Sequence, residues 1–284
     1  MRPNIELDID RQTLRPGDEL SGVLSVSGVG QHRGFSLSLQ GEEVLGADNI
    51  VRSYVLPVLD EKLVALEGGD PAIAEPHPFF FLLPADTPPS YSSQEFRCQY
   101  CLKARVRSGW RDTIQRYHLT ILPPQTAEEA QPEDGAHELV LEEEQLKLTA
   151  RLERTSIPTG GRMAGTLVLS RTGESAPPPG RLTFRFAAIE EATEPGYYYR
   201  KVLWLGTHEV QPEPEAEFPI GGYFEFALPD DAPFSGEWNT FKVHYGFRVG
   251  MILPSGRHVR QSLPIRVYRV YSPERPLARP RRRV

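Results

Sequence analysis

The stretch that most constrains the fold runs from Pro78 to Val106 and recurs, altered, from Phe224 to Val249. Each copy joins an apolar strand, a proline-rich loop and a second strand in which apolar and polar residues alternate. An offset of 145 residues relates Leu83 to Leu228 and Tyr100 to Tyr245. We interpret the chain as an internal duplication of one strand-rich unit.

Alternation of apolar and polar residues continues on both sides of this stretch. Segments such as Asn4–Asp10, Leu20–Ser27 and Arg33–Gln40 place apolar side chains on one face, which is typical of half-buried strands. Turn residues separate them every 8–12 positions or so, and the crossover helices that a parallel sheet needs are missing. The sequence therefore predicts an all-β fold of two tandem antiparallel β-sandwiches of immunoglobulin-like type.

Shifts in composition divide the chain into four parts. The region around 125–138 is rich in Glu and contains no Lys or Arg, whereas the end of the chain is rich in Arg. We predict an N-terminal sandwich over 1–124, an acidic linker over 125–138, a C-terminal sandwich over 139–271 and a basic tail over 272–284.

Charge and cysteine content narrow the classes of partner. A net charge of -6 makes nucleic acid an unexpected partner, although the basic tail could bind an anionic surface weakly. Two cysteines cannot hold a fold of this size together, which favours a reducing, cytoplasmic location. The N-terminus lacks the apolar core of a signal peptide, and no apolar run is long enough for a transmembrane segment.

Several motifs, in this order, resemble the arrestin-like family over roughly Met1–Tyr271. The first half carries Leu14-x-Pro16-Gly17-Asp18-x-Leu20-x-Gly22-x-Leu24, Phe35-x-Leu37-x-Leu39-x-Gly41-Glu42, His77-Pro78-Phe79-x-Phe81-x-Leu83-Pro84, Pro89-Ser90-Tyr91 and Tyr100-x-Leu102-Lys103-Ala104. The second half has Leu228-Pro229 and Tyr245-x-Phe247-x-Val249 as counterparts. Each motif alone is turn and core chemistry, and their order, spacing and duplication carry the resemblance.

The resemblance implies two β-sandwiches without enzymatic activity that act as an adaptor or scaffold for other proteins. The compact length is similar to that of small bacterial members akin to sporulation-control proteins. The tail carries no PPxY motif, and no charged switch cluster is identifiable, so ligase recruitment and receptor regulation are not carried over.

No motif for catalysis stands out. Cys98 and Cys101 form a CxxC, but on a strand they point to opposite faces, and a redox pair needs a helix N-terminus. The glycine-rich segment Gly28–Gly34 precedes a strand, which indicates a hairpin turn and not a phosphate loop. The seven His are scattered without metal-ligand spacing. We expect no enzyme activity, no cofactor and no metal.

Two segments are candidate binding regions. The first is the aromatic strand with Tyr197, Tyr198, Tyr199, Arg200 and Trp204, because Tyr, Trp and Arg dominate interface hot spots. Its two faces both carry aromatic residues, so at least one set is expected near the surface. The alternative is that one face is core and the other packs on a loop or on the neighbouring domain.

The second candidate is the tail, with Arg275, Arg279, Arg281, Arg282 and Arg283. It could bind an acidic partner, anionic lipid or nucleic acid, fold back on the acidic linker, or stay solvated.

The function expected from these features is a non-catalytic adaptor that binds a protein partner of unknown identity. Two alternatives remain open at this point. One is a β-sandwich carbohydrate-binding module or enzyme, which would need an aromatic platform beside paired carboxylates. The other is a peripheral membrane-associated protein that uses the Arg-rich tail.

Overall fold

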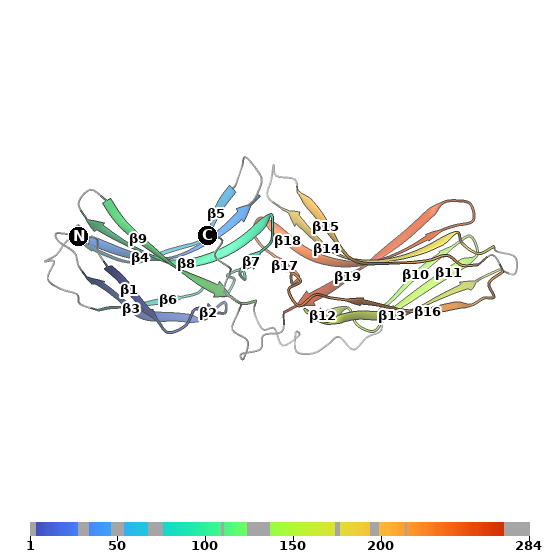
Figure 1. Cartoon of the computed structure of the whole chain (residues 1–284), viewed down its shortest axis with the longest axis horizontal. Helices are drawn as coiled ribbons and strands as arrows, with labels where there is room; N and C mark the ends of the chain where they lie inside the picture. The colour runs from blue at the N-terminus through green and yellow to red at the C-terminus, as the bar shows by residue number, and fades with distance from the viewer. Residues whose placement is uncertain are drawn as a thin grey trace. The chain divides into compact units, whose positions relative to one another are not determined.

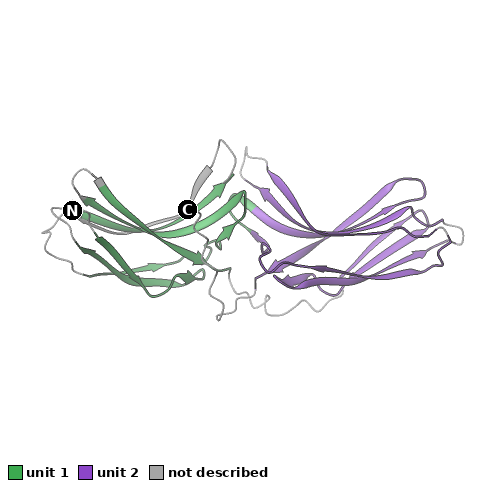
Figure 2. Cartoon of the chain, viewed as in Figure 1, with its two compact units in different colours: residues 1–125, 237–241 green, residues 126–236, 242–284 purple. Residues whose placement is uncertain are grey.

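A computed structural model describes residues 4–27, 34–46, 54–67, 76–108, 111–123, 137–173, 177–193, 199–213 and 215–269, and every structural statement below concerns these residues. Their regular secondary structure consists of β-strands throughout, so the chain is all-β, as the alternation predicts (Figure 1). The chain forms two compact units, which are residues 1–125 with 237–241 and residues 126–236 with 242–284 (Figure 2).

Unit 1 is built from two sheets that form two layers (Figure 1). The smaller sheet has the order β1 (Asn4–Ile9), β3 (Glu19–Ser27) and β6 (His77–Leu82). The larger sheet has the order β2 (Thr13–Leu14), β9 (Arg111–Ile121), β8 (Phe96–Ser108), β4 (Gly34–Leu45) and β5 (Tyr54–Glu67), with β7 (Tyr91–Ser92) paired to β8. All these pairs are antiparallel except β2 with β9.

Unit 2 repeats this arrangement with one additional strand. Its smaller sheet has the order β10 (His137–Glu143), β11 (Leu146–Leu152), β13 (Arg162–Arg171) and β16 (Ile220–Ala227). Its larger sheet has the order β12 (Ser156–Pro158), β19 (His258–Tyr268), β18 (Phe241–Ile252), β14 (Arg181–Ala192) and β15 (Arg200–Val210), with β17 (Gly236–Glu237) paired to β18. The larger sheets of the two units therefore have the same strand order, as a duplication requires.

Matching hydrogen bonds occur at equivalent positions of the two units. The hydroxyl of Tyr100 donates to the carbonyl oxygen of Pro88 at 2.6 Å. Tyr245 makes the same bond to Pro233. Both tyrosine rings are buried, so each hydroxyl needs a partner, and the proline loop supplies it. The shared Tyr and Pro of the two copies are thus scaffold.

The smaller sheet of each unit has, at an equivalent position, a glycine where a side chain would not fit. At Gly22, an added Cβ would collide with the carbonyl oxygen of Asp8 and lie 2.7 Å from the ring of Phe79. At Gly165, the ring of Phe224 takes the same position, also at 2.7 Å. Each glycine lets an aromatic ring pack directly on the backbone of the middle strand.

Strand alternation places the core side chains where the sequence predicts them. In β8 the buried residues are Phe96, Cys98, Tyr100, Leu102, Ala104 and Val106. The edge strand β5 contains a proline, Pro57. Pro57 pairs with Glu42, beside a register shift between Gly41 and Glu42. An edge strand tolerates a proline because the missing N–H is not needed for pairing.

The predicted segment boundaries fall largely outside the described residues. Of the acidic linker, only His137 and Glu138 are described, and they already belong to β10. The basic tail lies outside the described residues altogether.

Five residues from the second half of the chain, Glu237–Phe241, belong to unit 1. The ring of Phe241 stacks on Phe96 with centroids 4.8 Å apart, and Trp238 stacks on Phe241 at 4.6 Å. The indole Nε1–H of Trp238 donates to the carbonyl oxygen of Pro89 at 2.8 Å. Unit 1 therefore completes its core with residues from far along the chain.

The carboxylate of Glu43 satisfies the polar groups of this segment. Its side chain on β4 is fully buried. Oε1 accepts a hydrogen bond from the amide of Asn239 at 3.1 Å, and Oε2 accepts two from Thr240, from the amide at 2.9 Å and from the hydroxyl at 2.5 Å. Glu190 faces the core at the equivalent position of β14 and is also buried. The buried glutamate is thus part of the repeated architecture.

Candidate functional site

The strands β15, β14, β18 and β19 are neighbours in the larger sheet of unit 2 (Figure 1). The outer face of this sheet carries basic side chains from all four strands. Successive side chains of a strand point to opposite faces, and the inward sets of β14 and β18 are buried. The outward set includes Arg181, Arg185, Arg200, Trp204, Lys242, Arg248, Arg260 and Arg266, with the carboxylates Glu191 and Glu209. We call this surface the basic face of unit 2.

Two contacts establish the register between β14 and β18. The hydroxyl of Thr183 lies 2.7 Å from the position of a Cβ on Gly250, and Lys242 forms an ion pair with Glu191 at 2.7 Å. Going forward along β14 from Thr183 therefore corresponds to going backward along β18 from Gly250. Two residues on, Arg185 and Arg248 are cross-strand neighbours.

The register between β18 and β19 adds the third member of the group. Ser262 lies opposite Arg248, and Arg260 lies opposite Gly250. Three adjacent strands therefore each contribute one guanidinium, from Arg185, Arg248 and Arg260. We call these three side chains the arginine row.

Trp204 lies beside the arginine row. Its side chain is 49% exposed, although tryptophan is one of the largest apolar residues. It pairs with Ala187 at a bulge in β15, and the guanidinium carbon of Arg185 lies 5.4 Å from its ring centroid. This distance is in the range of a cation–π interaction, which holds both side chains on the surface.

Carboxylates on the basic face compensate only part of its charge. Glu209 is shared between Arg181 at 3.5 Å and Arg185 at 3.9 Å. Arg248 donates through Nε to the hydroxyl of Ser262 at 3.2 Å. Within the described part of the chain, no carboxylate lies at ion-pair distance from Arg248 or Arg260.

The like charges act on one another. Burial lowers the pKa of Arg248, and the positive charges of Arg260, Arg185 and Arg200 lower it further. An arginine remains protonated at neutral pH all the same, so the row carries uncompensated positive charge.

The structure places the sequence-predicted candidates as follows. Tyr197 and Tyr198 lie outside the described residues, and Tyr199 is half-buried just before β15. Arg200 and Trp204 both point to the basic face, and Arg200 lies 3.6 Å from Glu191. The tail residues Arg275, Arg279, Arg281, Arg282 and Arg283 lie outside the described residues.

Sequence reasoning missed the arginine row. Arg185, Arg248 and Arg260 are far apart in the sequence and meet only through strand pairing. A usable signal did exist, because each is an outward polar residue in an alternating strand. The order of the strands in the sheet was needed to join them.

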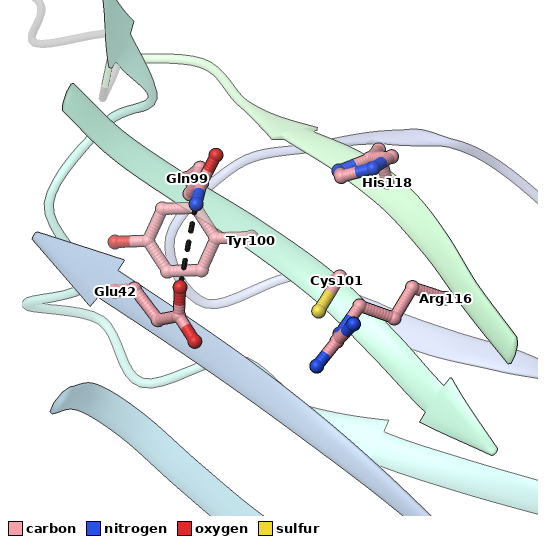
Figure 3. Close-up of a pocket in the computed structure, with 6 residues that line it drawn as sticks. All are labelled: Glu42, Gln99, Tyr100, Cys101, Arg116 and His118. Carbon is pink, nitrogen blue, oxygen red and sulfur yellow. Dashed lines mark hydrogen bonds between the residues drawn. The ribbon is translucent and has the colours of Figure 1, made fainter. Parts of the chain in front are cut away.

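A hollow of about 250 Å³ lies on the outer face of the larger sheet of unit 1 (Figure 3). Its lining consists of Glu42, Gln99, Tyr100, Cys101, Arg116 and His118. Burial and the charge of Glu42 raise the pKa of the Cys101 thiol above its ordinary value. A protonated thiol is a poorer nucleophile and a poorer metal ligand than a thiolate.

The other cysteine of the CxxC is buried. Cys98 faces the core, as its parity predicts, and burial raises the pKa of its thiol to about 12. Both cysteines are free thiols.

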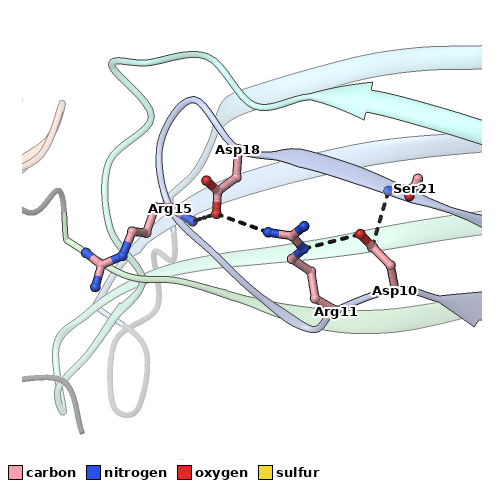
Figure 4. A network of polar contacts seen from close by, with 5 residues as sticks. All are labelled: Asp10, Arg11, Arg15, Asp18 and Ser21. Atoms are coloured by element: carbon pink, nitrogen blue, oxygen red, sulfur yellow. Dashed lines mark hydrogen bonds and ion pairs between the residues drawn. The ribbon is translucent and has the colours of Figure 1, made fainter. Parts of the chain in front are cut away.

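A polar network at the start of unit 1 is a turn brace (Figure 4). The carboxylate of Asp18 accepts from the amide of Arg15 at 2.8 Å and pairs with Arg11 at 3.8 Å. Gly17, between them, has a φ of 84°, which a glycine adopts without strain. These contacts hold the turn between β2 and β3, so the charges serve the fold.

Comparisons with protein-family models and with curated proteins find no match to this chain. Among the described residues, no group of three or more His, Cys, Asp or Glu could hold a metal ion. Across the same ranges, no helix has the length and hydrophobicity to cross a membrane.

Proposed function

We propose that this protein is a non-catalytic adaptor of arrestin-like type, which binds a protein partner through the basic face of unit 2. The observation that supports this most directly is the half-exposed Trp204 lying against Arg185. Trp and Arg are the residues most enriched among the hot spots of protein interfaces. Exposed aromatic area of this kind is costly in water and is compensated when a partner covers it.

The duplicated scaffold supports the same proposal. The repeated features, such as the Tyr100 and Tyr245 bonds, stabilise the sandwich in both units. The units differ at one position of this face: Arg185 stands where unit 1 has Ser38, because each lies across from the basic residue of β18 or β8. A carbohydrate platform is supported less well, because the charged neighbours that line Trp204 are guanidinium groups. We infer a cytoplasmic location from the two free cysteines.

A site-specific crosslinking experiment tests the proposal. A photoreactive phenylalanine analogue replaces Trp204 in the native host, and adducts are identified by mass spectrometry. The matched control carries the analogue at Tyr223, which is 54% exposed on β16 of the smaller sheet. We expect one discrete protein adduct from position 204 that is absent from position 223. Equal labelling at both positions, or no adduct at 204, would contradict a partner on this face.

A further inference from the structure

We propose that the arginine row of Arg185, Arg248 and Arg260 recognises an acidic segment of the partner, whose carboxylates pair with the three guanidinium groups and whose apolar side chain packs on Trp204. This inference rests on the proposed adaptor function and specifies the chemistry of the partner. It concerns residues that the sequence alone did not single out.

The spacing of the three guanidinium groups favours an extended ligand. They arise from three adjacent strands, which lie about 4.8 Å apart in a sheet. Arg185 and Arg248 are in one cross-strand line, and Arg260 is one step further along β19, opposite Gly250. The charges are therefore spread over the width of three strands and do not converge on one point. A segment that runs across the strands can meet them one after another.

The surface around the row leaves room for a polypeptide backbone. Arg248 is flanked on its own face of β18 by Gly246 and Gly250. Nothing lies within 4 Å of the position of a Cβ on Gly246, so the sheet is open there. Between the arginine row and Trp204, the outer surface of the sheet is formed by Gly246 and Ala187, whose side chains are a hydrogen atom and a methyl group. We call this part of the surface the floor. A ligand on this floor reaches the guanidinium groups from one side and the indole ring from the other.

The charge balance favours carboxylates over a compact phosphate. A guanidinium presents a fork of N–H groups that matches a carboxylate in bidentate geometry. Glu209 already occupies one side of Arg185, at 3.9 Å, and would repel a doubly charged group placed there. Single negative charges, spaced along a chain, avoid that repulsion and still reach Arg248 and Arg260. The protein as a whole has a net charge of -6, but the positive charge of the arginine row is concentrated at one place on the surface. The row therefore attracts acidic ligands in spite of the net charge.

A binding measurement with the intact protein tests this inference. The probe is a fluorescein-labelled oligo-glutamate peptide with one central leucine, followed by fluorescence anisotropy at low and at high salt. We expect saturable binding that weakens with salt, because salt screens exposed charges. The variants Arg248→Gln and Arg260→Gln should each weaken binding about tenfold, since a charge-assisted hydrogen bond is lost. Trp204→Ala should weaken it through the loss of the apolar contact.

Three controls decide the outcome. The variant Arg162→Gln removes the same charge from the smaller sheet of unit 2 and should bind the probe like the native protein. An oligo-glutamine peptide with the same leucine should not bind. Anionic phospholipid vesicles and inorganic phosphate should not compete at the concentrations at which the peptide does. Equal loss in Arg162→Gln, or vesicles that bind with the arginine dependence while the peptide does not, would overturn the inference.

The inference and the proposed function fail separately. If position 204 crosslinks to a partner but Arg248→Gln and Arg260→Gln retain that adduct, the adaptor function stands and the acidic ligand is wrong. If the acidic peptide binds through the arginine row but position 204 gives no adduct in the host, the adaptor proposal fails instead.

Discussion

The carboxylate of Glu43 accepts hydrogen bonds from both the amide and the hydroxyl of Thr240, although 197 positions separate the two residues in the chain. A fully buried carboxylate with three donors has no substitute of equal capacity, because a glutamine offers one acceptor and adds a donor. We predict that Glu43→Gln lowers the free energy of unfolding by about 3 kcal/mol, as judged from bonds to charged groups. Urea denaturation measures this change.

The neighbouring glutamate provides the control for that prediction. Glu42 lies on the outer face of β4 and accepts a bond from Gln99 at 3.3 Å in an exposed setting. Glu42→Gln should change stability by less than about 0.5 kcal/mol. Equal effects of the two substitutions would show that the long-range contact of Glu43 contributes nothing.

The two tryptophans described by the structure should respond in opposite ways to truncation. Trp238 is buried among Tyr91 and Phe241 in unit 1, whereas Trp204 is half exposed on unit 2. Trp238→Ala should cost about 3–5 kcal/mol of stability, as for other large buried aromatics. Trp204→Ala should cost less than about 1 kcal/mol. Thermal unfolding of both variants compares them directly, and a large loss for Trp204→Ala would show that this side chain is part of the core.

Stability should fall at alkaline pH because of a buried thiol. Burial raises the pKa of Cys98 from 9.0 to about 12, so between these values the folded state keeps a proton that the unfolded state has lost. The contribution is fully present below pH 9 and decreases by about 1.4 kcal/mol per pH unit above it. Burial raises the pKa of Tyr100 and Tyr245 as well, which steepens the fall at still higher pH.

Replacement of the thiol isolates its share of the alkaline effect. Cys98→Ala should reduce the slope of unfolding free energy against pH between pH 9 and pH 12, measured by urea titrations at each pH. An unchanged slope in that variant would assign the effect to the tyrosines alone.

Glycine substitutions should separate packing sites from open surface. Gly22→Ala and Gly165→Ala place a methyl group against a backbone carbonyl and an aromatic ring, so each should cost about 1–3 kcal/mol or prevent folding. Gly246→Ala meets only open space and should be tolerated. Circular dichroism and thermal unfolding report both outcomes. Tolerance of alanine at Gly22 would contradict the packing of Phe79 on that strand.

Much of the fold could be predicted because alternation is a local property. The inward set of β8 and the opposite facing of Cys98 and Cys101 follow from a period of two residues, with no knowledge of neighbours. The same holds for the turn at Gly17, where residue type and backbone angle are linked.

The arginine row and the role of Glu43 could not be predicted, because both depend on which strands are neighbours. Arg185 lies beside Arg248 only because β14 pairs with β18. The residue pattern within one strand does not predict which other strand it pairs with. Glu43 appears in the sequence as half of an acidic pair on a strand. Only the position of Thr240 shows why a carboxylate is buried there.

The membership of Trp238 and Phe241 in unit 1 has a consequence for the order in which the protein is made. Tyr91 and Phe96 leave the ribosome long before the two rings that cover them. Until residues 237–241 have emerged, the amino-terminal sandwich lacks the two rings that cover Tyr91 and Phe96. We therefore expect a fragment that ends at residue 125 to expose these two rings to water.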